Sequence, residues 1–345
     1  TLALSGAGAG ASATNTISGT TLARIGAGSD VNASGEVSVT AIDSSSLVSV
    51  VTAAALSVAV GGSGSISGSI AVSYANNNQT GNTQARISDS AVTTTSGGVS
   101  VQADNQSSLS VVGVAAALSV AGSGGLSLSG TGAGAVATNT ISNVTEAGIL
   151  DGADVEAAGD VSVAATNTSS VLTVVVAAAL STAVGSSGAI SVSVAAPVAT
   201  NTVGGTTRSR VRNSRVSSAG GVSVNADSDA EIEAWGLAAS LSVAGDGGFS
   251  VSGAAGASAV YNDLTETVEA SITDSALADA QGVFSANDLS VTATEESSVL
   301  TRSIAAALGV AVSGGVAVTV TMAVALAEAS ASADVLAAVD GSDVD

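Results

Sequence analysis

The chain has 345 residues and a formal net charge of −21, with 28 acidic residues against seven basic ones. It has no cysteine and no histidine, which excludes disulfides, thiolate metal sites and catalysis by a nucleophile with a histidine base. The acidic charge argues against nucleic acid as a partner, and the missing groups lead us to expect no enzymatic activity.

A period of about 62 residues runs along the whole chain. Counterparts of one leucine and of one asparagine recur in every unit, at Leu56, Leu118, Leu180, Leu241 and Leu308 and at Asn15, Asn77, Asn139, Asn201 and Asn262. Such a period is typical of repeat architectures, in which stacked units bury a continuous core. We therefore predict one array over residues 1–345, with units at about 15–76, 77–138, 139–200, 201–261 and 262–328 and partial units at both ends.

Each unit reads as the same series of elements, which is clearest between residues 139 and 200. The series is a polar turn at 139–143, short strands at 144–149 and 161–165 around a turn at 150–154, a polar segment at 167–170, and long strands at 171–184 and 189–200 joined by a Gly/Ser turn. Gly, Asn, Asp and Ser gather at the breaks, as turn conformations require.

Side chains alternate with period two along the long strands. Ile190, Val192 and Val194 share one face of the returning strand, and Ser191 and Ser193 lie on the other. This pattern predicts strands, and identical units stacked one strand apart predict an all-β, parallel β-solenoid. Each repeat makes either one broad coil or two to three smaller coils. Because one face is bulky and the other small, we expect neighbouring sheets to cover both.

Stacking in register predicts columns of matching residues. We expect the equivalent asparagines to form a structural ladder at a tight turn, where each amide bonds the next unit. We also expect an inter-repeat charge ladder, in which Arg208 lies between Glu146 and Glu269 and Asp154 lies opposite Arg215.

Two acidic turns offer oxygen ligands close together. Asp151 and Asp154 belong to one turn, and Asp340 and Asp343 belong to the other. Neither turn matches an EF-hand loop or a nonapeptide calcium array. We expect plain turns and no cofactor, with calcium as the alternative ligand.

The fifth unit is longer than the others, and the extra residues fall at 278–288. Insertions in repeat proteins map to surface loops that often carry binding sites, so we predict a protruding contact loop there. The recurring Thr-Asn-Thr triplet at 14–16, 138–140 and 200–202 suggests an ice-binding face as a further alternative, although the second and fifth units interrupt it.

An uncharged stretch of 25 residues, Ser303–Ala327, is long enough to cross a bilayer as a helix. It is also the repeat's own pair of strands, with a Gly-rich turn in the middle. We therefore expect no membrane span in this segment.

The segment 137–165, ATNTISNVTEAGILDGADVEAAGDVSVAA, alternates with long Ala/Val/Gly runs. In this style of repeat the chain resembles giant bacterial surface proteins, namely leukotoxin-type filamentous adhesins and autotransporter-like β-solenoid passengers. The resemblance implies an extracellular, fibre-like solenoid on a bacterial cell surface and carries no functional residue over.

Together these features predict a structural and adhesive segment of an extracellular bacterial fibre or filament. Its partners would be further copies of the same repeat, head to tail or in a continuing chain, and a host or neighbouring-cell surface. The alternative is a ligand-binding solenoid that recognises a glycan, calcium or ice on one face or on the 278–288 loop. Ligand-dependent stability would discriminate the two.

Overall fold

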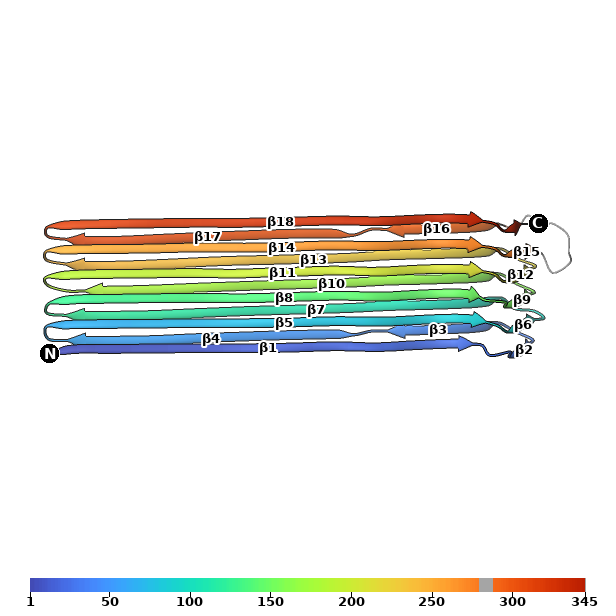
Figure 1. Ribbon diagram of the computed structural model, residues 1–345, viewed down its shortest axis with the longest axis horizontal. Helices are drawn as coiled ribbons and strands as arrows, with labels where there is room; N and C mark the ends of the chain where they lie inside the picture. Colours follow the sequence, from blue (N-terminus) through green and yellow to red (C-terminus); the bar gives the residue numbers. More distant parts are fainter. Residues whose placement is uncertain (279–287, 345) are drawn as a thin grey trace.

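The computed structural model describes residues 1–278 and 288–344. All of the regular secondary structure in these residues is β-strand. The predicted all-β, parallel β-solenoid is confirmed: strands of successive coils pair in parallel and build three sheets (Figure 1).

We call the first of these the forward sheet. Its strands, in stacking order, are β1 Leu2–Ile25, β5 Gly64–Ser88, β8 Leu126–Leu150, β11 Gly188–Arg212, β14 Phe249–Thr273 and β18 Val316–Asp340.

The return sheet runs back along the molecule and lies opposite the forward sheet. Its strands are β3 Val37–Asp43 with β4 Ser46–Gly61, β7 Val99–Ser123, β10 Val161–Val184, β13 Val222–Asp246, and β16 Leu289–Glu295 with β17 Ser298–Ser313.

The end sheet is made of short strands and closes one end of the coil. Its strands are β2 Asp30–Ala33, β6 Ala91–Thr94, β9 Asp154–Ala157, β12 Arg215–Ser218, β15 Ala276–Ala278 and β19 Asp343–Val344.

One coil passes through all three sheets before the chain returns to the same position. In the forward sheet Leu2 lies opposite Gly64, and Gly64 lies opposite Leu126. In the return sheet the leucine counterparts noted above are direct register partners, for example Leu118 and Leu180. Residues that recur at this interval in the sequence are therefore direct partners on neighbouring strands.

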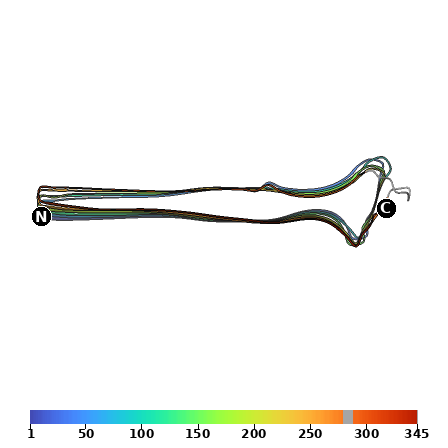
Figure 2. The same ribbon diagram turned by 90° about the horizontal axis from the view of Figure 1, so that it is seen from above.

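The coil is flat over most of its length and widens at one end. Figure 2 shows the forward and return strands close together, then separating where the end sheet lies. Ala and Ser dominate the interior of the flat part, for example Ala71, Ala133 and Ala195, which are at most 5% exposed. Larger side chains such as Ile87 and Ile149 fill the wide end. Small side chains let two sheets approach, whereas branched ones are needed to fill the wider space.

The expectation that sheets cover both faces of each strand is wrong. The small residues point inward, and the bulky residues of the flat part point outward into solvent. Leu56 is 61% exposed and Val60 is 75% exposed, whereas their inward neighbours Ser57 and Ala59 are buried. The interior of the flat part is filled mostly by small side chains, with larger ones such as Val51 and Val175 at fewer positions, so most of the bulk lies outside.

The strands are longer than the sequence pattern predicts. Residues 139–143, expected as a turn, lie inside β8, and 161–165 and 171–184 belong to the single strand β10. In the first and last return strands a short break remains, at 44–45 and at 296–297. The polar residues continue the strands because they bond to the same residues in the next coil, as described below.

Two local irregularities follow from residue chemistry. Pro197 has no N–H, and the pairing of β11 with β14 is interrupted at Ala196 and Pro197, although the pairing with β8 continues. Where the forward strands turn toward the end sheet, the chain adopts the left-handed conformation with φ of 46–61°, including Ala27 in the first coil and Gly341 in the last. Non-glycine residues suited to it are Asn and Asp, which occupy this turn as Asp89, Asp151, Asn213 and Asp274.

The uncharged segment Ser303–Ala327 forms parts of β17 and β18. Among the described residues, no helix is long and apolar enough to cross a membrane.

Candidate functional surfaces

The equivalent asparagines form a continuous ladder inside the molecule rather than at a turn. Each Nδ2 donates to the Oδ1 of the next coil, at 2.8 Å from Asn15 to Asn77, from Asn77 to Asn139 and from Asn139 to Asn201, and at 2.7 Å from Asn201 to Asn262. The four later asparagines are at most 3% exposed. The expected turn position is wrong, because the column lies mid-strand in the forward sheet, where it joins coil to coil.

A second interior ladder comes from the return sheet. Asn105 donates to Asn167 at 2.7 Å, Asn167 donates to the hydroxyl of Ser228 at 3.2 Å, and that hydroxyl donates to Oε2 of Glu266 at 3.2 Å. The series thus crosses from the return sheet to the forward sheet and ends on a carboxylate. None of this was predicted from the sequence.

Glu266 is a buried carboxyl group, with only 1% of the residue exposed. It occupies space that Gly205 leaves open, since a β-carbon on that glycine would lie 2.9 Å from Oε2. Burial raises the pKa of Glu266 to about 7, the Ser228 hydrogen bond lowers it, and the charge of Glu295 raises it. Its register column is otherwise uncharged, with Asn143 and Gly205 in the preceding coils. Aligning the repeats column by column would have singled it out.

In the described part of the chain, four ion pairs lie on the surface around the forward and end sheets. Arg208 pairs with Glu269 at 3.2 Å, Arg210 pairs with Glu146, Arg212 pairs with Asp151 at 2.8 Å, and Arg215 pairs with Asp154 at 3.2 Å. Arg208 does lie between Glu146 and Glu269 in register, but the carboxylate of Glu146 contacts Arg210 instead. Burial lowers the pKa of Arg210, the charge of Glu269 raises it and Arg212 lowers it. The arginines therefore neutralise acids of adjacent coils.

The four calcium candidates are spread over two places. Asp151 and Asp154 each contact an arginine, while Asp340 ends β18 and Asp343 begins β19. In the part of the chain that the structure describes, no three Asp, Glu, His or Cys side chains come close enough to hold a metal ion. The predicted contact loop at 278–288 lies outside the described residues except for its two ends.

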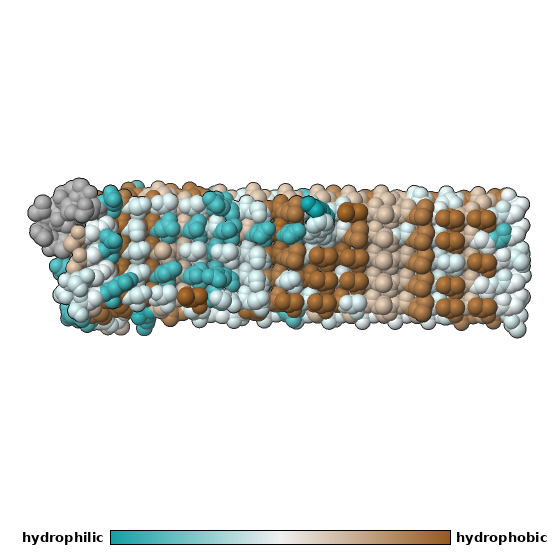
Figure 3. Space-filling view, turned by 180° about the vertical axis from the view of Figure 1, so that it is seen from behind, coloured by the Kyte–Doolittle hydropathy of each residue, from teal (hydrophilic) through white to brown (hydrophobic). Residues whose placement is uncertain are grey.

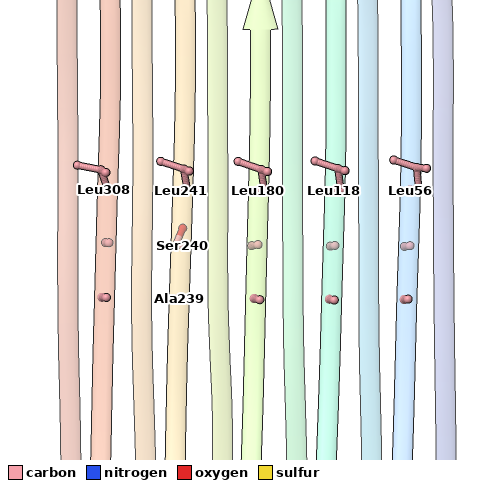
Figure 4. Close-up of a pocket in the computed structure, with 15 residues that line it drawn as sticks. Leu56, Leu118, Leu180, Ala239, Ser240, Leu241 and Leu308 are labelled. Atoms are coloured by element: carbon pink, nitrogen blue, oxygen red, sulfur yellow. The ribbon is translucent and has the colours of Figure 1, made fainter.

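The outer face of the return sheet is apolar over the half that adjoins the Gly/Ser turns (Figure 3). Two columns of residues give this face one raised strip and one recessed strip beside it. The Leu ridge consists of Leu56, Leu118, Leu180, Leu241 and Leu308, and the Ala groove consists of Ala54, Ala116, Ala178, Ala239 and Ala306. Both are outward-facing and lie side by side across the five return strands. Together they line a hollow of about 600 Å³ (Figure 4).

Further outward columns flank the ridge and the groove. In the first return strand these columns contain valine, with Val48 and Val50 on the far side of the groove and Val58 and Val60 on the far side of the ridge. The other half of the sheet is polar, as the hydrophilic colours of Figure 3 show. On β13, for example, Asp227, Asp229 and Glu231 replace the apolar residues. The return sheet is thus amphipathic along its strands.

Comparison with known proteins adds no relative. No protein-family model, no curated protein and no solved structure matches the chain.

Proposed function

We propose that this chain is a structural, non-catalytic segment of an extracellular bacterial surface fibre or filament. The observation that carries the proposal is the parallel pairing of strands about 25 residues long through all six strands of the forward sheet, which continues on both sides of the interruption at Pro197. Most backbone pairing between coils repeats that of the coil before it, and interior columns such as the Asn ladder do the same. Such a structure resists bending within the plane of its sheets and gives proteases few accessible segments.

The polar groups of the chain mostly serve the stack itself. The Asn ladder is buried and hydrogen-bonded from coil to coil, and four of the arginines contact acids of other coils. Side chains that are occupied in this way are poorly placed to bind a substrate. This use of the polar residues supports a scaffold in preference to an enzyme.

The ligand-binding alternative receives less support. The hollow beside the Leu ridge is lined by Ala and Leu with one Ser, which offers few hydrogen bonds to a glycan and no oxygen cluster to calcium. The column that contains Thr14 and Thr138 changes to Asn76 and Tyr261 in other coils, so it does not form a uniform ice-matching surface.

The proposed location and partners follow from the same architecture. β1 and β18 are the outermost forward strands, and each presents an unpaired edge of at least 24 residues. Unpaired edges pair readily with further strands, so the proposed partner at both edges is more of the same repeat. The resemblance to surface adhesins adds the bacterial cell surface as location and a host or neighbouring cell as the target.

The test combines microscopy with ligand-dependent stability. Electron microscopy of the native material and surface labelling of intact producing cells are expected to show regular extracellular fibres. Thermal unfolding of the purified chain should then be unchanged by millimolar calcium, by EDTA or by added glycans. A ligand present at 100 times its dissociation constant would stabilise the chain by about 2.7 kcal/mol. Such a shift, or a protein confined to the cell interior, would overturn the proposal.

A further inference from the structure

We propose that a second copy of this chain covers the apolar half of the return sheet, face to face, with the Leu ridge of each copy in the Ala groove of the other. The inference goes beyond the scaffold function and does not rest on it. It starts from the inversion described above, which places bulky side chains outside. A largely apolar surface of this extent is uncommon on a protein that stays unpartnered.

The raised and recessed columns of this surface fit those of a second copy. Leu180 and Ala178 are two residues apart on β10, so the ridge and the groove are adjacent columns on the same face. Rotating a copy by 180° about an axis parallel to the stacking direction, through the level of residue 179, reverses the order of the columns. Leu180 then faces Ala178 of the second copy, and the reverse contact forms as well. The same exchange occurs at every one of the five return strands.

The flanking columns match under the same rotation. The column of Val50 faces the column of Val60, so that Val174 meets Val184 of the second copy. On β13 the partner of Trp235, the single tryptophan of the chain, is Gly245. The largest outward side chain therefore faces a residue without one. Steric zippers between stacked sheets rely on this alternation of large and small residues.

Charge favours this arrangement over the other two-fold arrangement. An axis parallel to the strands, along β10, would place each column on itself, so that Leu180 would meet Leu180 of the second copy. The acidic half of β13 would then face the polar half of β7, with Asp227 opposite Asp104. The proposed axis instead points the acidic halves of the two copies in opposite directions. Like charges are then far apart, which matters for a chain with a net charge of −21.

The area is sufficient for a stable pair. The apolar half extends over residues 48–60 of the first return strand and across five strands. At about 3.3 Å per residue and about 4.8 Å between strands, this is roughly 40 Å by 24 Å, or about 1,900 Å² for the two copies together. Specific protein interfaces bury about 1,200–2,000 Å².

The polar residues on this surface are few. They are Thr52, Ser110, Thr182, Glu233 and Arg302. Glu233 accepts a hydrogen bond from Trp235 Nε1 at 2.9 Å, and the Arg302 guanidinium lies 4.2 Å from the centre of the Trp235 ring. Both charged groups belong to the column at the margin or to the last return strand, where solvent remains accessible.

The first experiment measures the mass of the chain in solution by sedimentation over a range of concentrations. Wild type should dimerise, and Leu180→Asp should weaken the dimer by at least about 100-fold, because it places two carboxylates in an apolar interface. Thr168→Asp, an outward substitution in the polar half of the same strand, is the matched control and should leave the dimer intact. Circular dichroism checks that each variant keeps its strands.

A second pair of variants tests the ridge and groove directly. Ala178→Leu fills the groove opposite Leu180 and should weaken the dimer, whereas the double exchange Ala178→Leu with Leu180→Ala restores a large residue opposite a small one and should rescue it. A wild type that is monomeric at all concentrations would overturn the proposal. So would a surface that is covered only when detergent or lipid is added.

The orientation has its own measurement. The chain has no cysteine, so Ser170→Cys gives a single site for a spin label. Residue 170 lies nine residues from the proposed axis, which predicts a separation of about 60 Å between the two labels of a dimer. A separation of about 20 Å would mean that each column faces itself and would overturn the ridge-in-groove arrangement.

Discussion

Glu266 is the best place to test how the interior responds to charge. Its carboxyl group is buried, it accepts one hydrogen bond from Ser228, and its Oε1 atom has no hydrogen-bond partner among the residues that the structure describes. We consider the substitution Glu266→Gln, which keeps the shape of the side chain and removes its titration. The comparison isolates the free energy of placing one negative charge between the two sheets.

The sign and size of the effect follow from proton linkage. The pKa of this group is raised from 4.5 when exposed to about 7 in the folded chain, so the folded state holds the proton more tightly. Its contribution is fully present below about pH 4.5, is lost progressively as the pH rises to about 7, and stays lost above that value. A difference of this size corresponds to about 3 kcal/mol of unfolding free energy.

The assay is chemical denaturation at several pH values between 4.5 and 8, followed by circular dichroism. Glu266→Gln should match wild type at low pH and exceed its stability by about 3 kcal/mol at pH 8. Asp263→Asn on the same strand removes an exposed outward charge and controls for the general effect of net charge. Equal pH dependence of wild type and Glu266→Gln, with Asp263→Asn behaving the same, would refute the reasoning.

Three further predictions concern the stack. Asn139→Ala should destabilise the chain by about 3 kcal/mol in the same denaturation assay, because buried groups of Asn77, Thr173 and Asn201 lose their partner, whereas the outward Thr138→Ala should change it by less than about 0.5 kcal/mol. Gly236→Ala should cost about 1–3 kcal/mol, because the new methyl group would lie 2.5 Å from Ser258 Oγ, while Gly130→Ala, which meets no atom within 4 Å, should be neutral or slightly stabilising in thermal melts. Arg215→Gln should change the unfolding free energy by less than about 1 kcal/mol, since the side chains of Arg215 and Asp154 are each 55% exposed; a larger, salt-insensitive loss would contradict the view that this pair is a weakly coupled surface contact.

The period and the alternation were sufficient to predict the fold, because both are direct consequences of stacking strands in register. Leu118 and Leu180 are recognisable as counterparts in the sequence for the same reason that they are neighbours in the sheet. Alternation alone, however, does not say which face is inside. Hydrophobicity would place Leu56 inside and Ser57 outside, and the structure has the reverse. The deciding quantity is the distance between the two sheets, which is a property of all the coils together.

The same limit applies to the polar residues. Asn139 reads as a turn residue by propensity, yet a column of asparagines supplies its own donors and acceptors and holds the strand extended. The ion pair of Arg210 with Glu146 depends on how long side chains cross between neighbouring strands, which register does not determine. Glu266 was missed because a search for recurring residues passes over it, and it stands out only as a charge in a column that is otherwise uncharged.

The breadth of the coil has a mechanical consequence. About 62 residues are used for each advance of about 4.8 Å along the stack, while each long strand extends about 80 Å across it. A molecule built this way is a plank rather than a thread: the strand length fixes its width, and each added coil lengthens it by only about 4.8 Å. Planks flex easily through their thin dimension and strongly resist bending within their plane. A longer array of these coils would therefore curl over its broad faces and stay straight along its edges.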